Sequence, residues 1–276
     1  MRLPYSRILL ATQHTEFDTG AERVAFELAR HHGTPLAGVL PLVINTEYEV
    51  VAPELAAQAA ARAFAGVGEI RAAAAEAGVA LDLGVRQGED AAREILAEAE
   101  RGGADLIVAR RRGKRGFLAA LPVGEMVMKV ATRAPCDVLL VPRAARMWSR
   151  RVLVAVDASP AADHVTETAA SIAVRFGLPL TIATVTAHDD AAGRAESDAI
   201  LARAMTVALR CGAKAESQVA TGRAAEGITA LAASIGADLV VVGRSDPARS
   251  GQRRRLGATA HGVTGLAPCP VLIVLT

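Results

Sequence analysis

Short apolar runs and longer alanine-rich segments alternate along this chain, and their order predicts the fold. The runs at residues 8–11 and 152–156 are almost continuously apolar, as strands buried on both faces of a sheet are. Helical segments at about 20–32 and 161–176 follow these two runs. Because two distant parts of the chain open with the same order of elements, we expect two domains of similar construction.

The same order continues to the end of each half. Glycine ends each first helix, at Gly33 and Gly177, and a proline two residues later cannot continue it. Alternating strands and helices with right-handed crossovers predict a parallel sheet covered on both faces. The fold class is therefore α/β, with two tandem doubly wound domains of five parallel strands each. The other predicted elements are strands at 36–40, 80–86, 106–109, 180–186, 214–220 and 239–242, helices at 54–77 and 190–211, further helices ending near 102 and 236, and a last helix and strand in each half.

The second half repeats the first in sequence as well as in pattern. Gly103–Val108 reads Gly-Ala-Asp-Leu-Ile-Val, and Gly236–Val241 reads Gly-Ala-Asp-Leu-Val-Val, an offset of 133 (238−105). The first helices end at an offset of 144 (177−33), so the first half carries 11 more residues (144−133), which we place in 41–53. We expect domains at 1–145 and 146–276. The same register aligns Gly124 with Gly257 and Ala134-Pro135-Cys136 with Ala267-Pro268-Cys269.

Composition and charge exclude several classes of protein. Hydrophobic residues make up 51% of the 276 residues but aromatic ones only 3%, too few for the stacking platforms of base-reading nucleic-acid modules. A net charge of +2 does not indicate a polyanion partner. No apolar run reaches membrane-spanning length, and the start lacks the apolar stretch of a signal peptide. Three cysteines are no disulfide framework. We expect a cytoplasmic protein without membrane insertion.

Ligands of such sheets bind beyond the carboxyl ends of the strands, where the strand order reverses. In the second half this edge carries Asp157 after the first strand and Gly243-Arg244 after the fourth. An aspartate there can accept hydrogen bonds from a base or sugar, or it can cap a turn. Gly257 then opens the last helix, where backbone N–H groups are available to a phosphate. These few glycines are a weak signal by themselves.

Taken together, these motifs resemble the universal stress protein superfamily. Residues 154–160 read Val-Ala-Val-Asp-Ala-Ser-Pro, 236–243 read Gly-Ala-Asp-Leu-Val-Val-Val-Gly, and 267–274 read Ala-Pro-Cys-Pro-Val-Leu-Ile-Val. The resemblance covers essentially the whole chain as a tandem pair. It implies an adenine nucleotide alpha hydrolase-like sheet and, in one branch of the family, bound ATP without a metal site of the protein's own. It also implies that the two domains pair as a pseudo-dimer through residues 138–141 and 271–274, and that a homodimer can form.

The family's nucleotide signature is Gly-x-x-Gly, nine residues, then Gly-Ser/Thr, with nucleoside contacts from the first loop and the end of strand two. The second half departs from it at Asp246 and Ala258, and ten residues (247–256) separate Asp246 from Gly257. The resemblance implies that an adenine nucleotide or related anion binds there. The implied site residues are Asp157, Val185, Gly243, Arg244, Gly257, Ala258 and Thr259.

The first half departs further from the signature. Gln13 stands where the second half has Asp157, Arg110 replaces Gly243, and Glu125 replaces the Ser/Thr. A carboxylate on the phosphate path would repel a triphosphate. Ten residues (114–123) lie between the two loop glycines that remain. We therefore do not expect an ordinary ATP site in the first half. The glycines are Gly113 and Gly124.

Three functional hypotheses stay open at this point. The first is a non-enzymatic, nucleotide-responsive stress protein, and the second is a ligand-free module that binds a protein partner through basic loops such as 110–115. The third, a hydrolase, lacks an identified nucleophile or metal set. His14, Glu16 and Asp18 could be read as metal ligands, but a polar loop with a helix cap explains them better.

Overall fold

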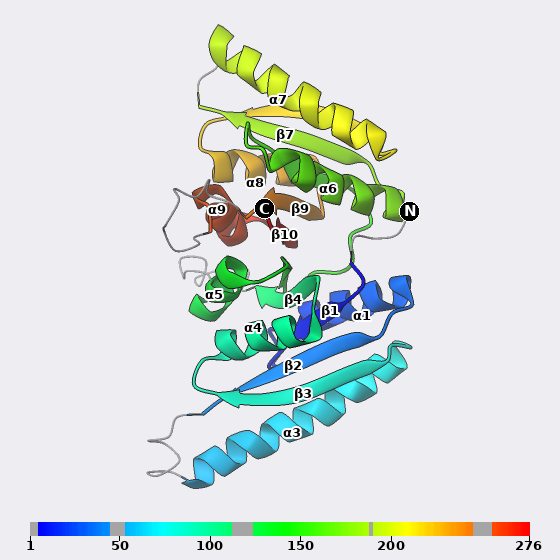
Figure 1. Ribbon diagram of the computed structural model, residues 1–276, viewed down its shortest axis with the longest axis vertical. Helices are drawn as coiled ribbons and strands as arrows, with labels where there is room; N and C mark the ends of the chain where they lie inside the picture. The colour runs from blue at the N-terminus through cyan, green and yellow to red at the C-terminus, as the bar shows by residue number, and fades with distance from the viewer. Residues whose placement is uncertain (1–4, 45–52, 112–123, 188–189, 245–255) are drawn as a thin grey trace. The chain divides into compact units, whose positions relative to one another are not determined.

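The structure is a computed structural model that describes residues 5–44, 53–111, 124–187, 190–244 and 256–276. The described residues form two compact units that meet in the sequence between Met147 and Trp148. Figure 1 labels the elements of both units along the colour ramp from blue to red. Within the described ranges, no helix combines the length and the apolar character needed to cross a bilayer.

The N-terminal unit is a five-stranded parallel sheet with helices on its faces. Its strands lie in the order β3-β2-β1-β4-β5, so the order reverses between β1 and β4. The chain adds β2 and β3 on one side of β1 and then β4 and β5 on the other, as expected for a doubly wound sheet. The elements are β1 (Ile8–Ala11), α1 (Thr19–His32), β2 (Leu36–Val43), α3 (Pro53–Glu76), β3 (Leu81–Gly88), α4 (Ala91–Gly102), β4 (Leu106–Arg111), α5 (Glu125–Arg133) and β5 (Asp137–Pro142).

The C-terminal unit repeats this architecture. Its strands lie in the order β8-β7-β6-β9-β10, all parallel, and the order reverses between β6 and β9. The predicted fold class of two five-stranded α/β domains is confirmed. The elements are β6 (Val152–Ala155), α6 (Ala162–Phe176), β7 (Leu180–Thr186), α7 (Ala191–Arg210), β8 (Ala215–Thr221), α8 (Ala224–Ser234), β9 (Leu239–Gly243), α9 (Ala258–Leu266) and β10 (Val271–Val274).

Two predicted helix ends have the expected backbone geometry. Gly33 and Gly177 follow α1 and α6 with φ of 64° and 66°, the left-handed region that glycine adopts without strain. The strands β1 and β10 are buried along their whole length, which explains why the sequence shows them as continuous apolar runs rather than alternating ones.

Strand β2 is longer than the sequence predicts, because it runs past residue 40 to Val43 and includes Pro41. The Val39 carbonyl accepts a hydrogen bond from the Thr12 N–H at 3.1 Å, so the backbone polar groups of Val39 point toward β1 and the loop after it. Those of residue 41, two positions further along the strand, point to the same side. Strand β1 ends at Ala11, and the missing N–H of Pro41 therefore interrupts no ladder bond. The remainder of the predicted insertion, 45–52, lies outside the described residues.

The repeated Gly-Ala-Asp motif has the same structural role in both units. The Asp105 carboxylate accepts hydrogen bonds from the backbone N–H groups of Ser6 and Arg7 at 2.6 and 2.9 Å. Asp238 accepts from the N–H groups of Ser149, Arg150 and Arg151 at 2.7 to 3.0 Å. Each aspartate thus fixes the segment that leads into the first strand of its own unit.

Candidate functional site

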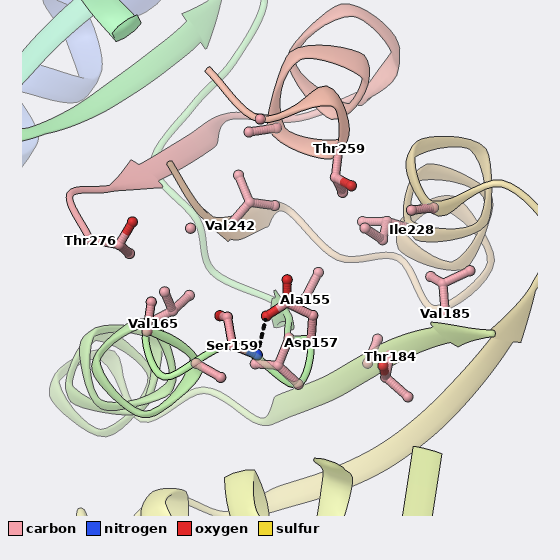
Figure 2. A pocket seen from close by; sticks show the side chains of 18 of the residues that line it. Ala155, Asp157, Ser159, Val165, Thr184, Val185, Ile228, Val242, Thr259 and Thr276 are labelled. Atoms are coloured by element: carbon pink, nitrogen blue, oxygen red, sulfur yellow. Dashed lines mark hydrogen bonds between the residues drawn. The ribbon is translucent and has the colours of Figure 1, made fainter. Parts of the chain in front are cut away.

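The strand-order reversal of the C-terminal unit opens onto a cavity of about 330 Å³. Such a volume is typical of small-molecule sites. Figure 2 shows residues from the first loop, from the strand ends and from α6, α8 and α9 surrounding it. The lining residues are Ala155, Val156, Asp157, Ser159, Ala161, Ala162, Val165, Ala183, Thr184, Val185, Ala224, Ile228, Val242, Gly243, Gly257, Ala258, Thr259, Ala260 and Thr276.

The cavity is lined by apolar and hydroxyl side chains, and Asp157 is the one charged side chain among its described lining residues. Strand ends supply part of the apolar surface, including Val185 of β7, and α8 supplies Ile228. The Asp157 Oδ1 atom accepts a hydrogen bond from the Ser159 N–H at 3.0 Å, drawn as a dashed line in Figure 2. The bond fixes the carboxylate at the cavity, where it can accept further hydrogen bonds from a ligand.

The start of α9 supplies unpaired donors at the same cavity. The first hydrogen bond inside the helix joins the His261 N–H to the Gly257 carbonyl at 2.9 Å, so the N–H groups of residues 258–260 have no partner within the helix. No described side chain caps this end. The helix dipole adds partial positive charge there. These groups line the cavity and can receive a phosphate or another anion.

Glycines let the elements around the cavity approach closely. A Cβ on Gly243 would lie 3.2 Å from the Val165 Cγ2 atom and 3.5 Å from the Thr276 Cγ2 atom. On Gly262 of α9, it would lie only 2.5 Å from the Cβ of Ala225 on α8, a distance that real Cβ atoms do not adopt. The position of α9 beside α8, and with it the position of the helix start at the cavity, depends on this missing side chain.

Six of the seven residues predicted for this site line one cavity, and Arg244 does not. Arg244 is 7% exposed, its N–H donates to the Val274 carbonyl at 2.8 Å, and its own carbonyl accepts from the Gly257 N–H at 3.1 Å. Its backbone therefore joins β9 to β10 and to the start of α9. The six that line the cavity are Asp157, Val185, Gly243, Gly257, Ala258 and Thr259.

Sequence reasoning missed the apolar and hydroxyl residues of the wall. Ile228 and Val165 contribute from α8 and α6, and Thr184 from the end of β7. A prediction of strand ends could have found Thr184, because it precedes Val185. Which face of a helix meets a cavity depends on tertiary packing, so Ile228 and Val165 had no comparable signal.

The corresponding corner of the N-terminal unit is spanned by Arg110. The Arg110 Nη2 atom donates to the Gln13 Oε1 atom at 2.7 Å, while Nη1 donates to the Thr15 Oγ1 atom at 2.8 Å and to the Asp18 Oδ2 atom at 3.0 Å. Asp18 is 1% exposed, so the guanidinium neutralises a buried carboxylate. The structure thus brings Gln13 and Arg110 together, as an internal hydrogen-bonded pair.

The last helix of this unit also differs from its counterpart. Gly124 precedes α5, and the Glu125 carboxylate, 83% exposed, pairs with the Lys129 Nζ atom at 3.0 Å. Lys129 also pairs at 3.1 Å with Asp90, the residue that caps the start of α4. Hydrogen bonds to Glu125 and Asp90 raise the pKa of Lys129 above its ordinary value. Glu125 therefore has a cationic partner in this structure. Gly113 lies outside the described residues.

The three residues considered as metal ligands in the sequence each pair with other charged side chains. His14 faces Glu22 and Glu69, Glu16 pairs with Arg143 at 3.0 Å, and Asp18 faces Arg110. Within the part of the chain that the structure describes, no cluster of three or more His, Cys, Asp or Glu residues could hold a metal ion.

Comparison with known proteins agrees with this architecture. A model of the universal stress protein family matches residues 4–142 and 149–274. The chain therefore belongs to the universal stress protein family and contains two of its domains in tandem. No curated protein matches the sequence.

Solved structures similar along the whole chain share its fold at low identity. A universal stress protein from Archaeoglobus fulgidus DSM 4304 has 19% identity and a TM-score of 0.74, covering 98% of this chain and 96% of its own. A putative universal stress protein from Pseudomonas aeruginosa UCBPP-PA14 has 18% identity and a TM-score of 0.69, covering 99% and 94%. At such identities the likeness shows the fold alone.

Some relatives bind nucleotides. A universal stress protein solved in complex with cAMP is 28% identical over 46% of this chain and 97% of its own, with a TM-score of 0.39. A universal stress protein from Archaeoglobus fulgidus in complex with dAMP is 23% identical over 45% and 97%, with the same TM-score.

Proposed function

We propose that this chain is a non-enzymatic, nucleotide-responsive stress protein whose C-terminal unit binds an adenine nucleotide or a closely related anion. The observation that carries this proposal is that Asp157 and the start of α9, which no described side chain caps, open onto the same cavity. It combines an acceptor for hydroxyl or amino groups with donors for phosphate, and apolar side chains line the same cavity.

The chemistry of the wall matches the parts of a nucleotide. The apolar side chains, among them Val185 and Ile228, offer a surface for a purine ring. The Ser159 N–H bonds to Oδ1 of Asp157, and under this proposal Oδ2 accepts a hydrogen bond from a ribose hydroxyl. The N–H groups of residues 258–260 then receive a phosphate. Thr259 adds a hydroxyl next to Ala258, where the family signature has its own.

The side chains that line the cavity favour binding of a ligand without its chemical conversion. The described lining residues include one carboxylate and no histidine, cysteine or lysine. General acid–base or nucleophilic catalysis ordinarily needs a second titratable partner within hydrogen-bond reach. In the N-terminal unit, the Arg110 side chain occupies the acceptors that a ligand would use, which supports a structural or regulatory role for that unit.

Mass spectrometry of small molecules released from freshly purified protein, together with calorimetric titration of ATP and AMP, tests the proposal. We expect an adenine nucleotide stoichiometric with the chain, or saturable binding of one. Replacing Asp157 by Ala removes a charge-assisted acceptor, and we expect binding to weaken by about tenfold or more. Asp198→Ala is the matched control, because Asp198 is an exposed carboxylate on α7 of the same unit and does not line the cavity.

A second variant tests the cavity itself. Ile228→Trp adds bulk to the apolar wall, and we expect it to abolish binding while the far-ultraviolet circular dichroism spectrum stays unchanged. If the wild-type protein releases no nucleotide and produces no heat with millimolar ATP or AMP, the proposal is wrong. The alternative of a ligand-free module that binds a protein partner would then take its place.

A further inference from the structure

His14 has an unusual backbone conformation at the carboxyl end of the N-terminal sheet. It follows β1 with φ of 51°, and it is the one non-glycine residue with positive φ among the described residues. Residues other than glycine rarely adopt this region, so other contacts must stabilise it. The His14 N–H donates to the Thr12 Oγ1 atom at 2.9 Å, which helps to hold the loop in this form.

Both ring nitrogens of His14 face carboxylates from different helices. Nδ1 lies 3.1 Å from the Glu22 Oε1 atom on α1, and Nε2 lies 3.0 Å from the Glu69 Oε2 atom on α3. A neutral imidazole carries one N–H, so one nitrogen would present its lone pair to a carboxylate oxygen. An imidazolium donates both hydrogen bonds, and the geometry therefore fits the charged ring.

Among the charged groups near His14, the Glu22 carboxylate pairs with the histidine, whereas Arg110 and Asp18 pair with each other. Glu22 is 8% exposed, and its Oε1 atom also accepts from the Thr12 hydroxyl at 2.7 Å. The neighbouring charged groups, Arg110 of β4 and Asp18, pair with each other at 3.0 Å. Partial burial lowers the pKa of His14, but hydrogen bonds to Glu22 and Glu69 and their charges outweigh it, so the pKa is raised above its ordinary value of 6.5.

His14 contacts α3 where this helix joins the unit. No described side chain in residues 53–65 is buried, whereas Gly66, Val67 and Ile70 are. A Cβ on Gly66 would lie 3.5 Å from the Cβ and Cδ2 atoms of His14, so the helix backbone passes directly over the ring. The His14–Glu69 contact is thus close to the first point at which α3 is held.

We propose that His14 is a pH-sensitive latch, which as an imidazolium ties α3 to α1 and to the loop after β1, and which releases the N-terminal part of α3 when it loses its proton. A histidine whose pKa is raised on folding stabilises the folded arrangement fully below its ordinary pKa of 6.5. This stabilisation is lost as the pH rises through the folded value. The release therefore falls above pH 6.5, in the range where a histidine with a raised pKa loses its proton.

The test uses the full chain, with histidine titration by nuclear magnetic resonance and amide hydrogen exchange of α3 corrected for the intrinsic pH dependence of exchange. We expect His14 to titrate above 6.5. As the pH rises through the His14 pKa, the protection of residues 53–70 against amide exchange should fall. The fall should be about tenfold for each unit by which the His14 pKa exceeds its ordinary value. Protection of α4 serves as the internal reference.

Three variants separate the latch from other causes. Glu69→Gln should lower the His14 pKa and flatten the pH dependence of α3 protection. Glu76→Gln removes the same charge from an exposed position of the same helix and should leave both as in the wild type. His14→Asn keeps a residue that tolerates positive φ but does not titrate, and should abolish the pH dependence. A His14 pKa at or below 6.5, or equal effects of Glu69→Gln and Glu76→Gln, would overturn the proposal.

Discussion

Arg110 lies 3.0 Å from the buried carboxylate of Asp18, and it stands at the repeat position that Gly243 occupies in the C-terminal unit. There Gly243 lines the cavity and has no side chain to place in it. The same repeat position thus carries an internal ion pair in one unit and lines a cavity in the other. Under the proposed function, this contrast would leave ligand binding to the C-terminal unit.

Removing the Arg110 guanidinium should destabilise the N-terminal unit. The side chains of Arg110 and Asp18 are 15% and 1% exposed, so Arg110→Ala leaves a buried carboxylate without its cation. We expect a loss of about 3 kcal/mol in the free energy of unfolding, measured by urea denaturation. Arg143→Ala breaks the exposed pair with Glu16 and should cost less than about 1 kcal/mol. Equal losses for the two variants would show that Asp18 does not depend on Arg110.

The close packing of α9 on α8 predicts that even one methyl group at Gly262 is harmful. Because its Cβ would lie 2.5 Å from that of Ala225, Gly262→Ala should destabilise the C-terminal unit by about 1–3 kcal/mol and weaken ligand binding at α9. The double variant Gly262→Ala with Ala225→Gly restores the space and should recover most of the loss. Thermal unfolding of the single and double variants checks this, and a double variant no better than the single one would contradict it.

The two Gly-Ala-Asp aspartates should show matching effects. Asp238→Asn replaces a carboxylate that accepts from three backbone N–H groups, and we expect a loss of about 1–3 kcal/mol. Asp105→Asn should have a similar effect on the N-terminal unit. Amide exchange at residues 7 and 151 reports each unit separately. A variant that raises exchange in both units equally would argue against a local role.

Glu98 should contribute stability that is lost in acid. Its hydrogen bond to Arg86 at 2.6 Å, together with the charges of Arg86 and Arg101, holds the pKa of Glu98 below its ordinary value of 4.5 despite partial burial. The contribution is therefore present above pH 4.5 and lost as the pH falls through the lowered value. Carboxyl titration by nuclear magnetic resonance should show a higher Glu98 pKa in Arg86→Gln. The exposed Arg93→Gln should leave it unchanged, and a shift there would contradict the pairing.

Local patterns in the sequence were sufficient for the order of the elements. Continuous apolar runs indicated buried parallel strands, and Gly33 and Gly177 marked helix ends, because these features depend on neighbouring residues only. The end of β2 was misplaced because Pro41 is tolerated only where the adjacent strand has stopped. Pairing of the two domains through their last strands, and homodimerisation, stay predictions.

By itself, the sequence determined that this protein consists of two related α/β domains and that the second departs less from the family's nucleotide signature than the first. Repetition and strand topology require no knowledge of packing. Only the tertiary structure decided that Ile228 and Val165 complete the cavity wall, that Arg244 joins strands instead of lining the cavity, and that Arg110 reaches Asp18. The direction of a side chain depends on contacts with residues far away in the chain, and those contacts cannot be predicted from the pattern of one sequence.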